Sequence, residues 1–285
     1  MESGELDVKH AKLGLKNSHK MRTLMGLCGP QTDNECKHIK TEEVGSEESQ
    51  AKSLLAAKKG MVLLKRGPLP FKKGTKIAVV GQSVNSAGGL TRNCDSPLCP
   101  KGGSSCWPSL GQAINASNVG GTTVVVASTD AAAATTAATA ADSVVCALDN
   151  ARDGGGEGQD RMTIWLSADQ IALANAVIAA NKNTVLALIN GGTISIDELA
   201  NSAPAIIEAF MPGAHGSTAI ASAVFGDNNP GGKRWLPVTM CHSNCINETK
   251  FLSMDMNDGV GRSHKCHTAT RCTPLDSASR TPRSV

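Results

Sequence analysis

Short apolar runs, separated by longer segments with helical periodicity, occupy the chain from residue 76 to residue 225. Each run is apolar at odd and even positions alike, which is expected of parallel strands covered on both faces of a sheet. Most of the runs end at glycine, asparagine or another polar residue, where a buried strand would stop. The predicted strands are residues 76–80, 123–127, 143–148, 184–189 and 205–210.

Apolar residues spaced three and four positions apart predict helices between these strands. Ser167 and Gln170 have the spacing of a capping box, in which two side chains and two backbone amides at a helix start satisfy one another. The predicted helices are residues 46–65, 107–116, 131–141, 168–181 and 215–225. The alternation predicts right-handed βαβ units, and hence an α/β fold with a doubly wound, mostly parallel sheet sandwiched between helices.

The pattern also divides the chain. Residues 1–45 are polar and basic without a sustained period, which favours irregular chain or a linker. Residues 46–240 carry the α/β pattern, and residues 241–285 form a tail rich in Cys, His, Ser and Thr that is expected to be irregular.

The composition disfavours several classes of function. The chain has 285 residues, a net charge of +3 and a sequence pI of about 8.3. This charge is too small to indicate a nucleic acid or an anionic membrane as partner. No run approaches the roughly 20 apolar residues of a membrane span. The first residues are polar, so no signal peptide is visible, and the compartment is left unassigned.

Glycine-rich nucleotide motifs and the nucleophile elbow are also missing from the sequence. No G-x-G-x-x-G follows a strand, and there is no P-loop and no G-x-S-x-G. A dinucleotide enzyme, a P-loop NTPase and an ordinary α/β-hydrolase are therefore disfavoured, and no cofactor is expected.

The segment after the strand at 143–148 is the most informative part of the chain. In a doubly wound sheet, sites form in the loops that leave the carboxyl ends of strands. This segment runs from Asp149 to Arg161 and places Glu157 between glycines, after a three-glycine run. Glycines permit unusual backbone angles and close approach of another molecule, so the carboxyl could act as a general acid or base. A solvated surface loop with an exposed Glu157 is the alternative from spacing alone.

The ten cysteines suggest further alternatives. Two Cys/His clusters in the tail could bind zinc, although their spacings fit no standard finger. Cys99 and Cys106 flank a glycine-containing turn and could form a disulfide, or both could be free thiols. The tail clusters consist of Cys241, His242, Cys245, His264, Cys266, His267 and Cys272.

A series of motifs in a fixed order resembles the carboxyl-terminal α/β sandwich domain of glycoside hydrolase family 3, the β-glucosidase and β-xylosidase family. The resemblance covers about residues 46–270. Earlier residues, from Met21 to Leu27, look like the last turn of that family's barrel domain. The motifs are Ala56-Ala-Lys-Lys-Gly-Met-Val-Leu-Leu-Lys65, Lys76-Ile-Ala-Val-Val-Gly81, Gly156-Glu-Gly-Gln-Asp-Arg161, Asn190-Gly-Gly192, Pro212-Gly213, Phe225-Gly-Asp227, Asn229-Pro230, Leu236-Pro-Val-Thr239 and Gly261-Arg-Ser263.

The resemblance implies roles for individual residues. Glu157 would be the acid/base that protonates the leaving glycosidic oxygen of a β-linked glycoside and then deprotonates the attacking water. Asp160 and Arg161 would support its loop, and Asp149 and Asn190 could contact sugar hydroxyls. A retaining pair needs its carboxyls about 5–5.5 Å apart.

The same resemblance places the nucleophilic Asp on an amino-terminal (β/α)₈ barrel, and no Asp of this sequence matches the nucleophile motif. The 285 residues are therefore expected to contain half of a site and to be inactive alone. A non-catalytic α/β domain that binds carbohydrate or protein is one alternative, and a metal or redox protein that uses the Cys/His tail is another. Members of the family are often secreted or vacuolar, which does not settle the compartment of this chain.

The absence of tyrosine bears on the metal alternative. Related sequences tend to have Tyr where this chain has Cys241, Cys245, His264, Cys266 and His267. We interpret these residues as substituted tyrosines and therefore expect no metal.

Overall fold

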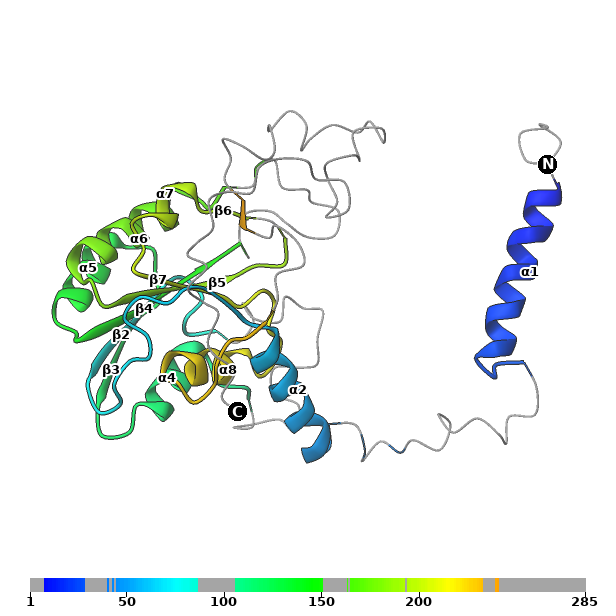
Figure 1. Ribbon diagram of the computed structural model, residues 1–285, viewed down its shortest axis with the longest axis horizontal. Helices are drawn as coiled ribbons and strands as arrows, with labels where there is room; N and C mark the ends of the chain where they lie inside the picture. Colours follow the sequence, from blue (N-terminus) through cyan, green and yellow to red (C-terminus); the bar gives the residue numbers. More distant parts are fainter. Residues whose placement is uncertain are drawn as a thin grey trace. The chain divides into compact units, whose positions relative to one another are not determined.

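The computed structural model, shown in Figure 1, describes residues 8–28, 40, 43, 45–86, 106–150, 163, 165–192, 194–232 and 239–240. The chain forms two compact units, Met1–Ala51 and Lys52–Val285. In its described part, no helix is both long enough and apolar enough to cross a membrane.

The first unit contains helix α1, Val8–Leu24, where the sequence pattern predicted irregular chain. That prediction was wrong because it relied on a missing hydrophobic period. Lys, Leu, Met and Arg are good helix formers whatever their order, and they make up much of this segment. Every residue of α1 is exposed, including Leu13, Leu15, Met21 and Leu24.

The second unit is built on a six-stranded sheet in the order β1-β7-β5-β4-β2-β3. Strands β2 to β7 of this sheet are parallel, and β1 joins its edge antiparallel to β7. A separate two-stranded sheet pairs β6, Ile194–Ser195, with β8, Thr239–Met240. The six strands are β1 Val62–Lys65, β2 Lys76–Val80, β3 Thr122–Val126, β4 Ser143–Asp149, β5 Thr184–Ile189 and β7 Ala205–Glu208.

Helices cover both faces of this sheet (Figure 1). Helices α4 and α8, with part of α2, pack on one face, and α5, α6 and α7 pack on the other. Strand β4 serves both layers: Val145 and Ala147 belong to one core, and Val144, Cys146 and Leu148 to the other. The helices are α2 Glu47–Gly60, α4 Leu110–Ser117, α5 Ala131–Thr139, α6 Ala168–Ala180, α7 Asp197–Ala200 and α8 Gly216–Val224.

The fold class is confirmed, and the strands at 76–80 and 184–189 have the predicted bounds. The helix predicted over 46–65 is wrong in its second part, because α2 ends at Gly60 and Val62 starts β1 opposite Glu208. A four-residue edge strand has too few positions to be distinguished from a helix by periodicity.

Two helix starts also differ from the sequence prediction. Helix α4 begins only at Leu110, because Ser109 and Gln112 form a capping box that was not predicted. The predicted capping box of α6 is wrong: Ser167 is the N-cap residue but makes no side-chain cap hydrogen bond.

The order of the strands reverses between β2 and β4. From β2 the chain moves outward to β3, returns past β2 to β4, and then continues the other way through β5 to β7. Ligands of doubly wound folds bind at the carboxyl ends of the strands at such a switch point. Gly81 leaves β2 there with φ 139°, and a Cβ atom at this position would overlap the carbonyl oxygen of Ala147 on β4.

Candidate active site at the carboxyl edge of the sheet

Two predicted site residues, Asp149 and Asn190, lie at the carboxyl ends of the neighbouring strands β4 and β5. Asp149 ends β4 and is paired in register with Ile189, the last residue of β5, so Asn190 lies one position beyond. Both side chains are almost inaccessible, with exposed fractions of 2% for Asp149 and 1% for Asn190. This burial favours support of neighbouring backbone over direct contact with a sugar.

One buried polar atom of Asn190, its side-chain oxygen Oδ1, has no hydrogen-bond partner among the described residues. Its backbone N–H donates to Phe210 O at 3.0 Å, and its Nδ2 donates to Gly192 O at 2.9 Å. Its Oδ1 is buried and accepts no hydrogen bond within the part of the chain that the structure describes. An unsatisfied buried carbonyl oxygen costs about 1–3 kcal/mol, so this position is costly to the fold.

The end of β7 brings an unusual backbone angle and a buried carboxyl to the same edge. Phe210 has φ 55°, which is rare for a bulky residue, and its N–H donates to Glu208 Oε1 at 3.0 Å. Glu208 is buried inside the strand. Glu208 is not among the predicted site residues, although a carboxylate inside an apolar run is a signal that could have found it.

A Trp–His pair lies where α4 and α8 begin. The rings of Trp107 and His215 meet edge to face, with centroids 4.6 Å apart and an interplanar angle of 61°. Burial lowers the pKa of His215 below its usual value, so the ring is neutral at neutral pH. Trp107 Nε1 and His215 Nε2 are both buried without a hydrogen-bond partner among the described residues. No local sequence signal predicts this pair, because its members come from distant segments.

The remaining predicted site residues, Glu157, Asp160 and Arg161, lie outside the described residues. The chain on either side of them is described. On one side, the N–H of Asn150 donates to Ile189 O at 3.4 Å. On the other, Trp165 forms a parallel bridge with Ser195 of β6, and its N–H donates to Thr163 Oγ1 at 3.2 Å.

The described residues include two free cysteines, of which Cys28 is exposed and Cys146 is buried. Cys106 is disulfide-bonded, whereas its suggested partner Cys99 lies outside the described residues. Cys146 is a free thiol buried in β4, and desolvation raises its pKa to about 12, so it is not a nucleophile at neutral pH. The described residues contain no cluster of three or more potential metal ligands, and the Cys/His tail lies beyond them.

Known proteins resemble the chain over most of its length. The family model of the glycosyl hydrolase family 3 C-terminal domain matches residues 61–266. Probable beta-D-xylosidase 7 of Arabidopsis thaliana is 34% identical over 269 residues, which span 90% of this chain and 34% of that protein. A beta-xylosidase of Formosa agariphila is 27% identical over 262 residues, 85% of this chain and 35% of that protein.

Solved structures agree with these matches. The β-glucosidase of Listeria innocua in complex with isofagomine superposes with a TM-score of 0.61 at 27% identity, over 74% of this chain and 29% of that one. A family 3 β-glucosidase of Bifidobacterium adolescentis gives a TM-score of 0.55 at 28% identity, over 67% of this chain and 29% of that one. The chain spans about one third of the length of these relatives. It belongs to glycosyl hydrolase family 3, and residues 61–266 correspond to the C-terminal domain of that family.

Proposed function

We propose that this chain supplies Glu157 as the acid/base of a site that hydrolyses β-linked glycosides. The proposal depends most on the position in the sheet from which the Glu157 segment starts. It follows Asp149 and Asn150 at the end of β4, beside the point where the strand order reverses. Loops at such points form the ligand sites of doubly wound folds.

The sequence of this segment adds chemical support. In Gly156-Glu-Gly-Gln-Asp-Arg161, one carboxyl lies between two glycines, and the oppositely charged residues Asp160 and Arg161 follow after Gln159. A general acid assists the departure of a poorly leaving alcohol by protonating the glycosidic oxygen, an effect worth about 10²–10⁴-fold in rate. Asp160 and Arg161 would hold the segment, and Asp149 and Asn190 would support the strand ends from which it departs.

The second carboxylate would come from a (β/α)₈ barrel domain that precedes these residues. The relatives are about three times as long as the matched region, since the chain covers 34% of one xylosidase and 35% of another. Helix α1 is consistent with such a neighbour, because Leu13, Leu15, Met21 and Leu24 all lie exposed. We therefore assign residues 1–45 to the end of a barrel domain and a linker, residues 46–240 to the sandwich domain and residues 241–285 to a tail.

Activity of two polypeptides would test this proposal: the 285-residue chain alone, and the same chain fused behind the first two thirds of the Arabidopsis xylosidase. We expect only the fusion to hydrolyse nitrophenyl β-xyloside or β-glucoside, because a double displacement needs both carboxyls. Robust turnover by the chain alone would contradict the requirement for a barrel.

A pair of variants in the fusion tests the role of Glu157. Glu157→Gln is expected to reduce kcat at least about 100-fold for alkyl glycosides, which need protonation, and much less for dinitrophenyl glycosides, which do not. Asp153→Asn removes a carboxyl from the same segment and is the matched control, expected to behave like the parent. Equal activity of Glu157→Gln and the parent towards both substrates would remove Glu157 from the site.

A further inference from the structure

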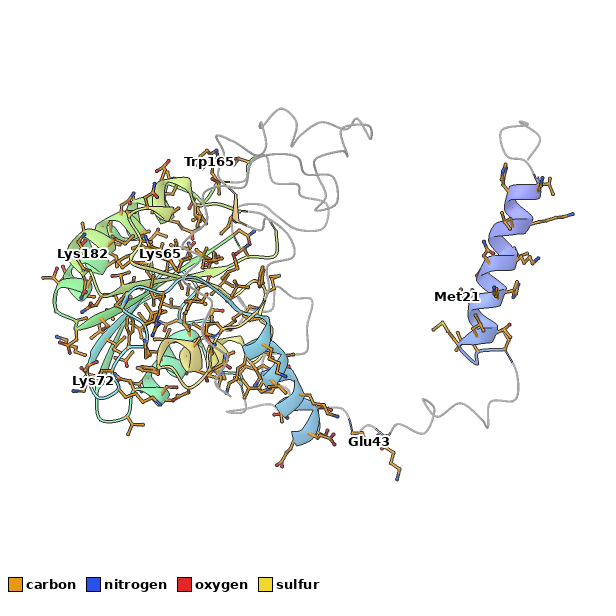
Figure 2. The ribbon with its side chains drawn as sticks, viewed as in Figure 1. Met21, Glu43, Lys65, Lys72, Trp165 and Lys182 are labelled. Atoms are coloured by element: carbon orange, nitrogen blue, oxygen red, sulfur yellow. The ribbon has the colours of Figure 1, made fainter. Side chains whose placement is uncertain are left out.

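The chain is described on both sides of the Glu157 segment, and one side chain links the strand before the segment to the helix after it. The segment departs from β4 after Asn150 and returns at Thr163 and Trp165, and α6 starts at Ala168. Gln170 is the third residue of that helix. Figure 2 labels Trp165, which marks the return of the segment and bridges to Ser195 of β6.

The side-chain amide of Gln170 makes two hydrogen bonds to the backbone of Asp149, the last residue of β4. Its Oε1 accepts from the N–H of Asp149 at 2.8 Å, and its Nε2 donates to the carbonyl oxygen of Asp149 at 2.7 Å. Both residues are nearly inaccessible, with exposed fractions of 4% and 2%. Hydrogen bonds in such a dry environment are electrostatically stronger than in water, and each would be costly to leave unmade.

This use of Gln170 replaces the one expected of it. The spacing of Ser167 and Gln170 predicted a capping box, yet Ser167 makes no side-chain cap hydrogen bond and the glutamine side chain points to β4 instead. Helix α6 therefore starts without a side-chain cap, in contrast to α4, where Ser109 and Gln112 form one. Gln170 therefore serves β4 rather than the start of its own helix.

We infer that Gln170 is a positioning residue for Glu157. It ties the end of β4, where the segment departs, to the first turn of α6, the helix that follows the segment, and so restricts movement of one against the other. The inference rests on the proposed acid/base role of Glu157. A general acid displaced by about 1 Å can lose on the order of 10²-fold in rate. If the end of β4 is held less firmly, proton transfer from Glu157 is expected to weaken first.

The test uses the fusion with the barrel domain and three substitutions. Gln170→Met keeps the length of the side chain but makes neither hydrogen bond, and Gln170→Glu can still accept from the N–H of Asp149. Asn118→Leu is the matched control, because Asn118 is also a buried amide that bridges backbone groups, Gly74 N and Thr75 O, at the opposite edge of the sheet. The melting temperature of each variant reports the purely structural loss.

We expect Gln170→Met to reduce kcat for alkyl glycosides at least about tenfold more than kcat for dinitrophenyl glycosides, with KM changed less than about twofold. The readout is selective because only the former substrates depend on the acid. Gln170→Glu is expected to lie between Gln170→Met and the parent. Asn118→Leu should lower the melting temperature without changing the ratio of the two kcat values.

Each outcome decides between the inference and the proposed function. If Glu157→Gln is selective and Gln170→Met is not, Gln170 is a structural residue only and the inference is overturned. If Glu157→Gln is not selective, the acid/base proposal fails and the inference fails with it. If Gln170→Met does not fold, Gln170→Glu decides, and an unchanged ratio in that variant overturns the inference.

Discussion

Buried polar side chains differ in their hydrogen bonding between the two edges of the central sheet, which are formed by the amino and the carboxyl ends of its parallel strands. At the amino edge, where helices return to strands, buried or half-buried side chains are hydrogen-bonded to backbone. Asn118 Oδ1 accepts from Gly74 N–H at 2.9 Å, and its Nδ2 donates to Thr75 O at 2.9 Å. Asn181 Nδ2 donates to Ala138 O and Ala141 O at 3.0 and 2.8 Å.

At the carboxyl edge, several buried polar atoms have no hydrogen-bond partner among the described residues. These atoms are Asn190 Oδ1, Trp107 Nε1, His215 Nε2 and Ser217 Oγ. The same edge holds Phe210 at φ 55° and Gly81 at φ 139°. Groups that are costly to the fold cluster at functional sites, so the contrast favours the carboxyl edge as the place of the site.

The largest effect is expected where the carboxyl edge is most tightly packed. Gly81→Ala adds a methyl group that overlaps the carbonyl oxygen of Ala147, in a backbone conformation unfavourable to alanine. Strain and overpacking together should lower the free energy of unfolding by about 2–5 kcal/mol, measured by urea denaturation. Gly192→Ala is the control at the same edge, because a Cβ there meets nothing within 4 Å. Equal stability of both variants would show that β2 and β4 can separate at the switch point.

A smaller loss is expected from the amino edge. Asn118→Leu leaves the N–H of Gly74 without its acceptor, whereas Thr75 O keeps the hydrogen bond from Thr122 N–H. The free energy of unfolding should fall by about 2 kcal/mol, the cost of one unsatisfied group. Asn115→Leu on the exposed side of α4 is the control and should be nearly neutral. A neutral Asn118→Leu would remove the contrast between the two edges.

Helix starts at the carboxyl edge offer a finer comparison. Ser109→Ala removes a capping box from α4 and should cost about 1 kcal/mol in thermal or urea unfolding. Ser167→Ala on α6 should stay within about 0.5 kcal/mol, since this serine makes no side-chain cap hydrogen bond. The reverse ranking would mean that Gln170 is bound to its own helix rather than to β4.

The last comparison concerns pH, and its effect vanishes at neutral pH. Burial lowers the pKa of His215 in the folded protein, whereas the unfolded chain keeps a pKa of about 6.5. Between that pH and the lower folded pKa, the unfolded state binds more protons than the folded state. Stability should therefore fall as the solution is acidified through this interval and level off below the folded pKa. Stability measured from pH 8 to pH 5 should fall less steeply in His215→Gln than in the parent. His19→Gln, on the exposed helix α1, is the control and should keep the slope of the parent; an unchanged slope in His215→Gln would contradict burial of the ring.

Much of the sheet could be predicted because its strands are encoded locally. Strands β2 and β5 are continuous apolar runs that end at Gly81 and Asn190, and such runs are buried whatever lies around them. Strand β1 could not be predicted in this way, because its four residues acquire strand structure only by pairing with β7. Helix α1 has no apolar face and therefore no hydrophobic period, although its residues favour a helix.

By itself, the sequence determined the α/β alternation, the family and the candidacy of Glu157, because these depend on patterns of neighbouring residues. Only the tertiary structure decided that Asp149 and Asn190 are buried at the ends of neighbouring strands, that Trp107 meets His215, and that Gln170 holds β4 instead of capping its own helix. The reason is physical: a hydrogen bond or ring contact between distant segments depends on which strand ends the chain topology brings together, and local spacing carries no information about that choice.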